Sequence, residues 1–334
     1  MKSLVSILIS AKNEAAFLED CLCSIQNQTY QNWECIVIDD HSSDNTFNII
    51  EKFGKIDKRF KGFKNHNKGI IEALRLAYKN STGDFISRMD ADDIMTKNRI
   101  DVLLNNLLKS GKNRVSVGQV KYFSKNELGE GFRNYQNWLN QLTETGNNFK
   151  DIFKECVIPS PCWMVHRKDL EAVNAFDENR YPEDYDLAFR FYEAGYEVVP
   201  CDQALHHWRD YPTRSSRTDE NYADHTFTEI KAHYFFKLKR NKDKELAIIG
   251  AGHRGKKLVK KLLELHESFI WIDQNPNKIG KDIYDIRIQP LKDVVDLKGK
   301  QIIVTLSNEE VKSELCQIFK SHKLEEMKDF FFFA

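Results

Sequence analysis

The chain has 334 residues, which is too long for one ordinary domain and fits two. Hydrophobic residues make up 41% of it and charged residues 30%, the profile of a globular protein that buries sizeable cores. The 50 basic and 50 acidic side chains cancel, so the net charge gives no general attraction to nucleic acid and we expect no nucleic-acid partner.

No segment predicts a membrane span or a cleaved leader. The apolar runs are shorter than the roughly 18 to 20 residues that a helix needs to cross a bilayer, and the start of the chain lacks the pattern of a signal peptide. The seven cysteines are scattered, without a pair at metal-binding spacing, as in a protein that is kept reduced. We therefore expect a cytoplasmic protein.

The first 120 residues alternate predicted strands and helices. The strands are expected at 4–10, 33–39, 60–63 and 84–88, and the helices at 14–28, 44–53 and 68–80. The first strand is almost wholly apolar, as a buried parallel strand should be. Strand–helix–strand units in this order favour an α/β fold with a mainly parallel sheet and right-handed crossovers.

The pattern is less regular from residue 97 onward. The expected elements are a helix at 99–108, one strand at 115–123, a long excursion at 126–150 and a helix at 184–194 that Gly195 ends. The run 231–244 holds six Lys or Arg against one Asp, which indicates a solvated helix and linker or, alternatively, a membrane-surface contact. We expect one domain at 1–241 and a second at 245–334.

Acidic residues follow three of the predicted strands. The first strand runs into Lys12-Asn13-Glu14, the second ends in Asp39-Asp40, and a later strand runs into the cluster 90–93. Ligands of an open parallel sheet bind outside the carboxyl ends of its strands. Each acidic group alone could be a helix cap or a turn residue, but three such groups in one domain indicate a binding site.

The cluster Asp90-Ala91-Asp92-Asp93 suits a hard divalent cation. Two carboxylates separated by one small residue can both reach one metal ion, and Mg²⁺ or Mn²⁺ prefers oxygen ligands. Such an ion neutralises the two phosphates of a nucleotide sugar as the sugar leaves. An aspartate at a strand end, such as Asp40, can also bond a base N–H or ribose hydroxyls.

Three ordered segments, 5–14, 37–44 and 83–93, resemble those of family-2 glycosyltransferases, inverting enzymes with the GT-A nucleotide-sugar fold. The resemblance extends over roughly the first 215 residues. It implies that Asp90 and Asp92 form the metal-binding DXD motif and that Asp90 also faces the donor. The residues that it places around the nucleotide sugar are Ser10, Lys12, Asn13, Glu14 and Asp40. The chain departs from the family at Lys12, where an aromatic residue is usual, and at Arg75, which could face the diphosphate or be solvated.

The segment Pro182-Glu183-Asp184 resembles the Glu-Asp segment at a helix start in the same family. Inverting transfer needs one carboxylate to take the proton of the acceptor hydroxyl. The resemblance implies that Asp184 is this base and that Glu183 orients the acceptor. From the residues alone, Asp184 could instead be an acid that caps the positive end of a helix.

The segment 205–217 resembles the family's loop that closes over the diphosphate. Arg209, Arg214 and Arg217 supply guanidinium groups suited to phosphate. His207 could be a third metal ligand, since a neutral imidazole suits Mn²⁺. A packed or surface histidine is the alternative interpretation.

A glycine fingerprint opens the second predicted domain. Gly250, Gly252 and Gly255 form G-x-G-x-x-G between a strand and a helix. The next strand ends at Asp273, near the spacing that a ribose-binding carboxylate takes. This predicts a small Rossmann-like domain, similar to those found beside polysaccharide-assembly enzymes. Two interpretations stand equal: an accessory unit that binds a nucleotide or NAD(P), or a docking and dimerisation unit with a vestigial site.

The sequence therefore predicts a cytoplasmic, metal-dependent inverting glycosyltransferase for cell-surface polysaccharide biosynthesis. Its expected partners are a nucleotide-sugar donor and a glycan or lipid-linked acceptor. Contact with the inner membrane surface or an assembly complex, and homo-oligomer formation, are left open. The alternatives are an NAD-linked sugar-nucleotide oxidoreductase and a non-catalytic nucleotide-sugar-binding scaffold.

Overall fold

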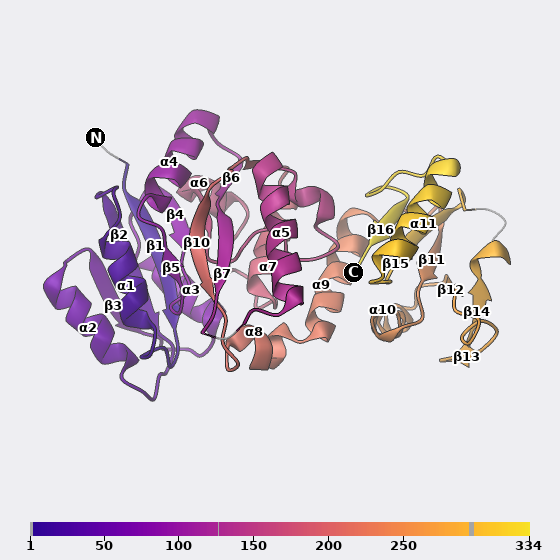
Figure 1. Cartoon of the computed structure of the whole chain (residues 1–334), viewed down its shortest axis with the longest axis horizontal. Helices are drawn as coiled ribbons and strands as arrows, with labels where there is room; N and C mark the ends of the chain where they lie inside the picture. The colour runs from indigo at the N-terminus through magenta and orange to yellow at the C-terminus, as the bar shows by residue number, and fades with distance from the viewer. Residues whose placement is uncertain (1–2, 126, 294–296) are drawn as a thin grey trace. The chain divides into compact units, whose positions relative to one another are not determined.

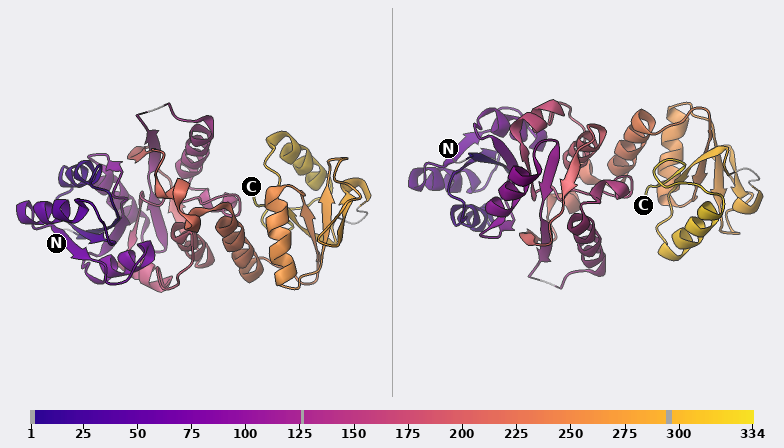
Figure 2. Two further views of the ribbon diagram at one scale, coloured as in Figure 1. Left: turned by 90° about the horizontal axis from the view of Figure 1, so that it is seen from below. Right: turned by 90° about the horizontal axis from the view of Figure 1, so that it is seen from above.

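The computed structural model describes residues 3–125, 127–293 and 297–334 (Figures 1 and 2). Its contacts divide the chain into two compact units. The first comprises Met1–Phe149 and Val157–Arg214, and the second comprises Lys150–Cys156 and Ser215–Ala334. Among the described residues, no helix is both long enough and apolar enough to cross a bilayer.

The first unit is built on a seven-stranded sheet in the order β3-β2-β1-β4-β8-β6-β9. The strands are β1 (Val5–Ala11), β2 (Trp33–Asp39), β3 (Phe60–Lys64), β4 (Phe85–Arg88), β6 (Arg114–Val117), β8 (Trp163–His166) and β9 (Glu197–Val199). Strands β1 to β4 are parallel, whereas β8 runs antiparallel to both of its neighbours. The predicted mixed and mainly parallel sheet is confirmed.

Helices and a second small sheet complete the first unit. The helices are α1 (Leu18–Gln26), α2 (Thr46–Ile56), α3 (Ile70–Lys79), α4 (Arg99–Ser110), α5 (Glu130–Thr145), α6 (Arg167–Ala172) and α7 (Glu183–Glu193). A 3₁₀ turn, η1 (Asn148–Asp151), follows α5, with residues from both units. The small sheet has the order β5-β10-β7, from β5 (Ile94–Met95), β10 (Ala204–Arg209) and β7 (Gln119–Phe123).

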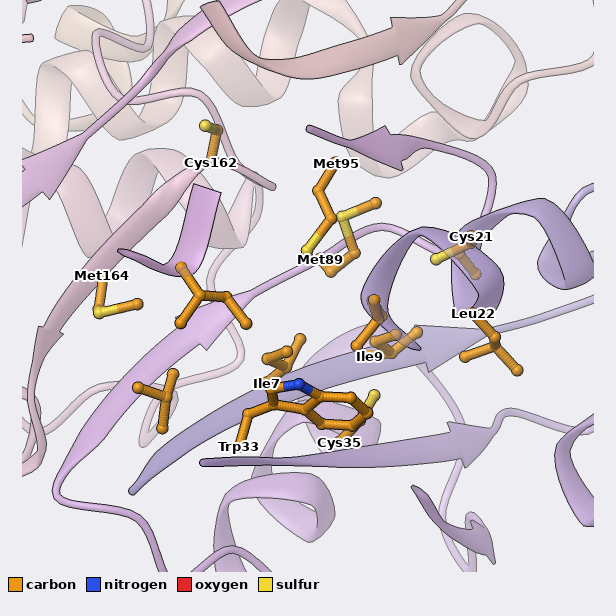
Figure 3. Packing of buried hydrophobic residues seen from close by; sticks show 14 of the residues in the cluster. Ile7, Ile9, Cys21, Leu22, Trp33, Cys35, Met89, Met95, Cys162 and Met164 are labelled. Carbon is orange, nitrogen blue, oxygen red and sulfur yellow. The ribbon is translucent and has the colours of Figure 1, made fainter. Parts of the chain in front are cut away.

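The hydrophobic core of the first unit follows strand alternation. Ile7 and Ile9 of β1 and Trp33 and Cys35 of β2 lie on one face of the sheet, and α1 packs there through residues such as Leu22 (Figure 3). Every second residue of a strand points to the same face, so these apolar positions pack together. The rigid core fixes the carboxyl ends of β1, β2 and β4 at one edge of the sheet.

Two predicted elements of the first unit are wrong. The single strand expected at 115–123 is two strands, β6 in the large sheet and β7 in the small one, because the chain changes sheets at Gly118. A Cβ there would meet the Leu205 side chain at 2.8 Å and Cys162 Sγ at 2.9 Å. The excursion expected at 126–150 contains the 16-residue helix α5, which ends before Gly146 in the left-handed region (φ 70°).

The second unit contains a six-stranded sheet in the order β13-β14-β12-β11-β15-β16. The strands are β11 (Glu245–Ile249), β12 (Phe269–Asp273), β13 (Asp282–Ile283), β14 (Ile286–Pro290), β15 (Lys300–Val304) and β16 (Phe330–Phe332). The helical elements are α8 (Ser215–Thr218), η2 (Glu220–Tyr222), α9 (Asp224–Leu238), α10 (His253–Glu264), η3 (Leu291–Asp293) and α11 (Glu309–Ser321). Among the described strands of this second unit, the pairing of β13 with β14 is antiparallel and the other pairings are parallel.

The structure places the division between units earlier than the predicted boundary near residue 241. Helix α9 belongs to the second unit, because Phe235 packs against Phe331 and Phe333, with ring centroids 5.1 and 6.0 Å apart. The segment 150–156 joins the same unit through Phe153, whose ring lies 5.5 Å from that of Phe331. The change in composition at 241 thus marks the end of a helix.

Candidate active site

The loops after β1 and β2 are joined by hydrogen bonds. Asn13 Oδ1 accepts from the Ser43 backbone N–H at 2.8 Å, and the Asn13 N–H donates to Ser42 Oγ at 2.9 Å. The Glu14 N–H donates to Thr46 Oγ1 at 2.8 Å. Asn13, which the sequence assigned to the nucleotide sugar, therefore shapes the loop. Ser10 is half-buried near the end of β1, and the neighbouring Lys12 is exposed.

Asp40 connects the end of β2 to the start of α3. Its carboxylate accepts from Asn65 Nδ2 at 2.7 Å and from the Gly69 N–H at 3.0 and 3.1 Å. The neighbouring Asp39 is 4% exposed, and its Oδ1 has no hydrogen-bond partner among the described residues. The sequence singled out only Asp40, yet Asp39 is the carboxylate whose oxygen stays open at this strand end.

Four carboxylates repel one another at the ends of β1 and β4. Burial, followed by the charges of Asp92 and Asp90, raises the pKa of Glu14 to about 8. Burial and the charge of Asp93 raise the pKa of Asp92 to about 7, and burial likewise raises the pKa of Asp93. The predicted cluster therefore carries an excess of negative charge that a cation would stabilise.

Asp93 is held by the small sheet. The Arg209 N–H donates to its Oδ1 at 2.7 Å, and His206 Nε2 lies 2.9 Å from its Oδ2. Arg99 Nη1 lies 3.0 Å from His206 Nδ1. Burial and the charge of Arg99 lower the pKa of His206, so the neutral ring accepts from Arg99 and donates to Asp93. Asp93 thus fastens the acidic loop to β10.

His207, the predicted third metal ligand, follows His206 in β10, and successive side chains of a strand point to opposite faces. Its ring is a neighbour of Phe123, with centroids 6.4 Å apart. In the described part of the chain, no group of three or more His, Cys, Asp or Glu side chains is arranged to hold a metal ion. A metal ligand at His207 stays a prediction, and His206 is the histidine that contacts the acidic cluster.

Two of the three predicted arginines lie beside the acidic cluster. Arg209 donates from Nε to the Asp92 carbonyl at 2.6 Å and packs over the rings of Phe17 and Phe123. Arg214 is buried, with Nε 3.8 Å from Asp92 Oδ2. Arg217 belongs to α8 of the second unit.

Tyr211 also contacts the cluster, because its hydroxyl donates to Asp92 Oδ2 at 3.0 Å. No motif in the sequence assigned a role to this residue. Its aromatic ring packs 4.8 Å from that of Phe17, which holds the hydroxyl in place. Tyr211 and Arg214 therefore fix one oxygen of Asp92 from the segment that follows β10.

Asp184 lies in the first turn of α7, where its Oδ1 accepts from the Tyr185 N–H at 2.8 Å. Burial, followed by the charge of Glu183, raises the pKa of Asp184, while the charge of Arg88 opposes that rise. A carboxylate with a raised pKa is better suited to accept a proton near neutral pH than an ordinary surface aspartate.

Arg88 connects this helix to the acidic cluster. Its Nε lies 3.1 Å from Asp90 Oδ1, and its Nη1 lies 2.9 Å from Glu183 Oε1. Glu183 was predicted to orient the acceptor, but its side chain is buried against Arg88. The structure thus brings Asp90 and Glu183, the neighbour of Asp184, to the same arginine although they lie far apart in the sequence.

Arg75 has partners of its own in α3 and in the loop before α7. It donates to the carbonyls of Phe176 and Asp177, the latter at 2.6 Å, and pairs with Glu72. It also lines a cavity of about 270 Å³ with Tyr78. The structure shows Arg75 bracing this loop, and the predicted contact with the diphosphate stays a prediction.

The glycine fingerprint of the second unit forms the predicted tight turn. Gly250 has φ 113°, and a Cβ on Gly255 would meet the Gly250 carbonyl oxygen at 1.9 Å, so both positions require glycine. Around Gly252 a Cβ would meet nothing within 4 Å. Asp273, the predicted ribose ligand, accepts instead from the Ala251 N–H at 2.6 Å and the Asn275 N–H at 2.8 Å. The arrangement gives no support to NAD(P), because this carboxylate is used within its own unit.

The fold and the strand-end acids define a glycosyltransferase of the GT-A type. The family model for glycosyl transferase family 2 matches residues 6–173, so the chain belongs to this family. The predicted membership of family 2 is therefore confirmed.

The chain is similar to several curated glycosyltransferases, of which it covers part. An uncharacterized glycosyltransferase of Haemophilus influenzae is 33% identical over 192 residues, covering 54% of this chain and 58% of that protein. The probable glycosyltransferase YdaM of Bacillus subtilis is 28% identical over 258 residues, covering 72% and 60%. The Escherichia coli UDP-Glc:alpha-D-GlcNAc-diphosphoundecaprenol beta-1,3-glucosyltransferase WfgD is 38% identical over 109 residues, covering 32% and 42%. The chain thus spans less than two thirds of each of these relatives.

Solved structures agree on the fold. The S. aureus TarS 1–349 structure in complex with UDP-GlcNAc superposes with a TM-score of 0.54 at 17% identity, covering 78% of this chain and 72% of that one. The Pyrobaculum calidifontis mannosyltransferase PcManGT in complex with GDP-Man and Mn²⁺ gives a TM-score of 0.50 at 18% identity, covering 80% and 70%. At this level of identity the likeness concerns the fold alone.

Proposed function

We propose that the chain is an inverting, metal-dependent glycosyltransferase that moves a sugar from a nucleoside-diphosphate sugar to a hydroxyl group of a glycan or lipid-linked acceptor. One observation carries the proposal: Arg88 bonds both Asp90, at the donor side, and Glu183, the neighbour of Asp184. A transferase needs a diphosphate-binding group and a base at the same place, and this bridge brings candidates for both together.

In the proposed reaction, Asp184 takes the proton of the acceptor hydroxyl. The acceptor oxygen forms a bond to the anomeric carbon of the sugar, and the bond from that carbon to the diphosphate oxygen breaks on the opposite face. The electron pair leaves with the nucleoside diphosphate. Burial raises the pKa of Asp184, which supports the role of base because the ionised form then accepts a proton readily.

The acidic cluster fits a hard divalent ion that has few protein ligands. Asp90 and Asp92 offer carboxylate oxygens, and burial, followed by the charges of neighbouring carboxylates, raises the pKa values of Glu14 and Asp92. Mg²⁺ and Mn²⁺ commonly bind through one or two carboxylates and the phosphates of a substrate. When bound, the ion would supply charge stabilisation for the leaving diphosphate.

The donor base and ribose are proposed to lie over the ends of β1 and β2. Asp40 and Asn13 fix the two loops there, and Asp39 Oδ1 is a buried acceptor without a partner among the described residues. Arg209 and Arg214 add positive charge beside Asp92, which supports a role next to the diphosphate.

A lipid-linked acceptor is proposed from the chemistry of one relative. The name of WfgD describes transfer to a GlcNAc-diphosphoundecaprenol, a sugar attached to a membrane lipid through a diphosphate. A chain that acts on such an acceptor would meet it at the inner membrane surface, in polysaccharide biosynthesis. Vesicles that carry a lipid-linked sugar would test this against a free glycan.

The second unit is proposed as an accessory unit that binds a nucleotide or docks a partner, including a second copy of the chain. Open space around Gly252 supports the first role. Equilibrium dialysis with labelled nucleotides, done on the whole chain and on its Gly252→Trp variant, would separate these two roles. Loss of one of two bound nucleotides per chain in that variant would support the first role, and an unchanged number of bound nucleotides would contradict it.

The proposed function is tested by a panel of UDP-, GDP- and dTDP-sugars, with Mn²⁺ or with EDTA. We expect one donor class to release nucleoside diphosphate in Mn²⁺ only, and Asp92→Asn to release at least about 10²-fold less. Donor binding without any release, even with an acceptor mixture, would favour the scaffold alternative. Full release by Asp92→Asn would contradict the proposal.

A further inference from the structure

Arg88 is a buried residue of the segment 83–93, to which the sequence assigned no role of its own. It bonds a carboxylate on each side of the candidate site, Asp90 Oδ1 at 3.1 Å and Glu183 Oε1 at 2.9 Å. We propose that Arg88 is a positioning residue that fixes the base Asp184 relative to Asp90, the carboxylate on the side of the sugar donor. This inference rests on the proposed function, because it assigns a place to two groups of that reaction.

The backbone of Arg88 is held in the sheet, as a positioning residue requires. It is the last residue of β4, which lies between β1 and β8, and it pairs in register with Leu8. Its carbonyl accepts from Arg99 Nη2 at 2.7 Å. The guanidinium therefore extends from a fixed point in the middle of the sheet, and its side chain is only 6% exposed.

The contact with Glu183 fixes the start of α7. Glu183 is the first residue of that helix, and its side chain is 3% exposed. A buried carboxylate is stable only when it is paired, so the first turn of α7 is held where Glu183 meets the guanidinium. Asp184 is the next residue and moves with this turn.

The geometry requires an arginine. The two bonds leave from different nitrogens, Nε to Asp90 and Nη1 to Glu183. A lysine has one ammonium group and cannot reproduce this planar fork. Arg88→Lys therefore keeps the charge while it loses the simultaneous hold on both carboxylates.

The charges around Asp184 support the same role. Burial and the charges of Glu183 and Asp90 raise the pKa of Asp184, and the charge of Arg88 lowers it. Removing Arg88 should therefore raise this pKa, and removing the charge of Glu183 should lower it. A residue that only supports the fold would not shift the two pH profiles in opposite directions.

The test compares Arg88→Lys, Arg88→Met, Glu183→Gln and the double variant Arg88→Met/Glu183→Gln with the wild type, in Mn²⁺ and the best donor. The double variant removes both buried charges together, so it is expected to fold even where Arg88→Met alone does not. We expect kcat to fall about 10²-fold in Arg88→Lys and in the double variant, while the donor KM changes less than about threefold.

Three further measurements complete the test. Arg59→Met is the matched control, because Arg59 pairs with Asp57 outside the site and should leave kcat unchanged. The acid limb of kcat/KM should move to lower pH in Glu183→Gln and to higher pH in Arg88→Met. Circular dichroism melting identifies variants that are folded.

The outcomes separate the two claims. If the wild type releases nucleoside diphosphate but a folded double variant and Arg88→Lys retain wild-type kcat, the inference about Arg88 is overturned and the proposed function stands. If the wild type releases none from any donor, the proposed function fails, and the inference fails with it. Loss of kcat with an unchanged donor KM and opposite pH shifts supports Arg88 as a positioning residue.

Discussion

Adjacent histidines of β10 differ in their surroundings. His206 is fully buried between Arg99 and Asp93, whereas the neighbouring His207 is partly exposed and close to Phe123. Because side chains alternate along a strand, one residue of difference decides which ring contacts the acidic cluster. The local sequence His206-His207 does not say which of the two faces inward, since that depends on the pairing with β5 and β7.

This difference predicts unequal effects of substitution. His206→Ala should lower the free energy of unfolding by about 2 to 4 kcal/mol, because it leaves Arg99 and Asp93 without a shared partner in a buried place. His207→Ala is the matched control and should cost less than about 1 kcal/mol. Urea unfolding followed by tryptophan fluorescence measures both, and equal losses would contradict the assignment.

The raised pKa of Asp184 predicts a pH dependence of the reaction. A base must be ionised, so activity is lost as the pH falls through its pKa, and a raised pKa moves this loss above the ordinary value of 3.8. We expect kcat/KM of the donor reaction to fall on the acid side well above pH 4. A profile that stays flat down to pH 4 would show that Asp184 does not act as the base.

Much of the candidate site follows from the sequence at the scale of single residues, because Asp40, Asp90 and Asp92 sit at predicted strand ends. The partners that hold the site were not predictable. Arg88 meets Glu183 across 95 positions of the chain, and His206 meets Asp93 across 113. Contacts of this kind depend on the tertiary structure and leave no local pattern.

Helix α5 packs along strand β7 in an arrangement that the local sequence does not predict. Asn140 of α5 accepts from the Val120 N–H at 2.9 Å and donates to the Val120 carbonyl at 2.8 Å. Gln136 accepts from the Tyr122 N–H at 2.7 Å. The helix thus satisfies the free edge of β7 through side chains, which explains why a segment rich in Asn is helical here despite a modest propensity.

Substitution of Asn140 tests this arrangement. Asn140→Ala should lower the free energy of unfolding by about 1 to 3 kcal/mol, because both backbone groups of Val120 lose their partner. Asn137→Ala, on the exposed side of the same helix, should be neutral or slightly stabilising, since alanine favours helices. Thermal melting of the two variants compares them directly. If Asn137→Ala cost as much as Asn140→Ala, the edge-covering role would be wrong.

At the scale of the whole molecule, the chain consists of a family-2 glycosyltransferase unit and a second α/β unit. The sequence predicted the mainly parallel sheet of the first unit and the strand–turn–helix start of the second, because both are local patterns, but the three-stranded sheet β5-β10-β7 was not predicted. It placed the boundary by composition, at 241, whereas the contacts place it after Arg214. A boundary depends on which side chains pack together, and α9 packs through Phe235 with the strand that ends the described chain.

The aromatic core of the second unit should contribute strongly to the stability of that unit. Phe331 is fully buried and contacts the rings of Phe153 and Phe235. Phe331→Ala should lower the free energy of unfolding of this unit by about 3 to 5 kcal/mol. Hydrogen exchange, followed by mass spectrometry, should show faster exchange in 245–249 and 300–304. Unchanged exchange there would contradict the packing of α9 and 150–156 with the terminal strand.

The central claim is that Asp184 is the base of a sugar transfer whose donor lies at Asp90 and Asp92. The most direct test measures nucleoside diphosphate release and donor binding for Asp184→Asn in Mn²⁺. We predict that this variant binds the donor within about threefold of the wild type and transfers at least about 10²-fold more slowly. Wild-type transfer by Asp184→Asn, with the donor bound normally, would contradict the account.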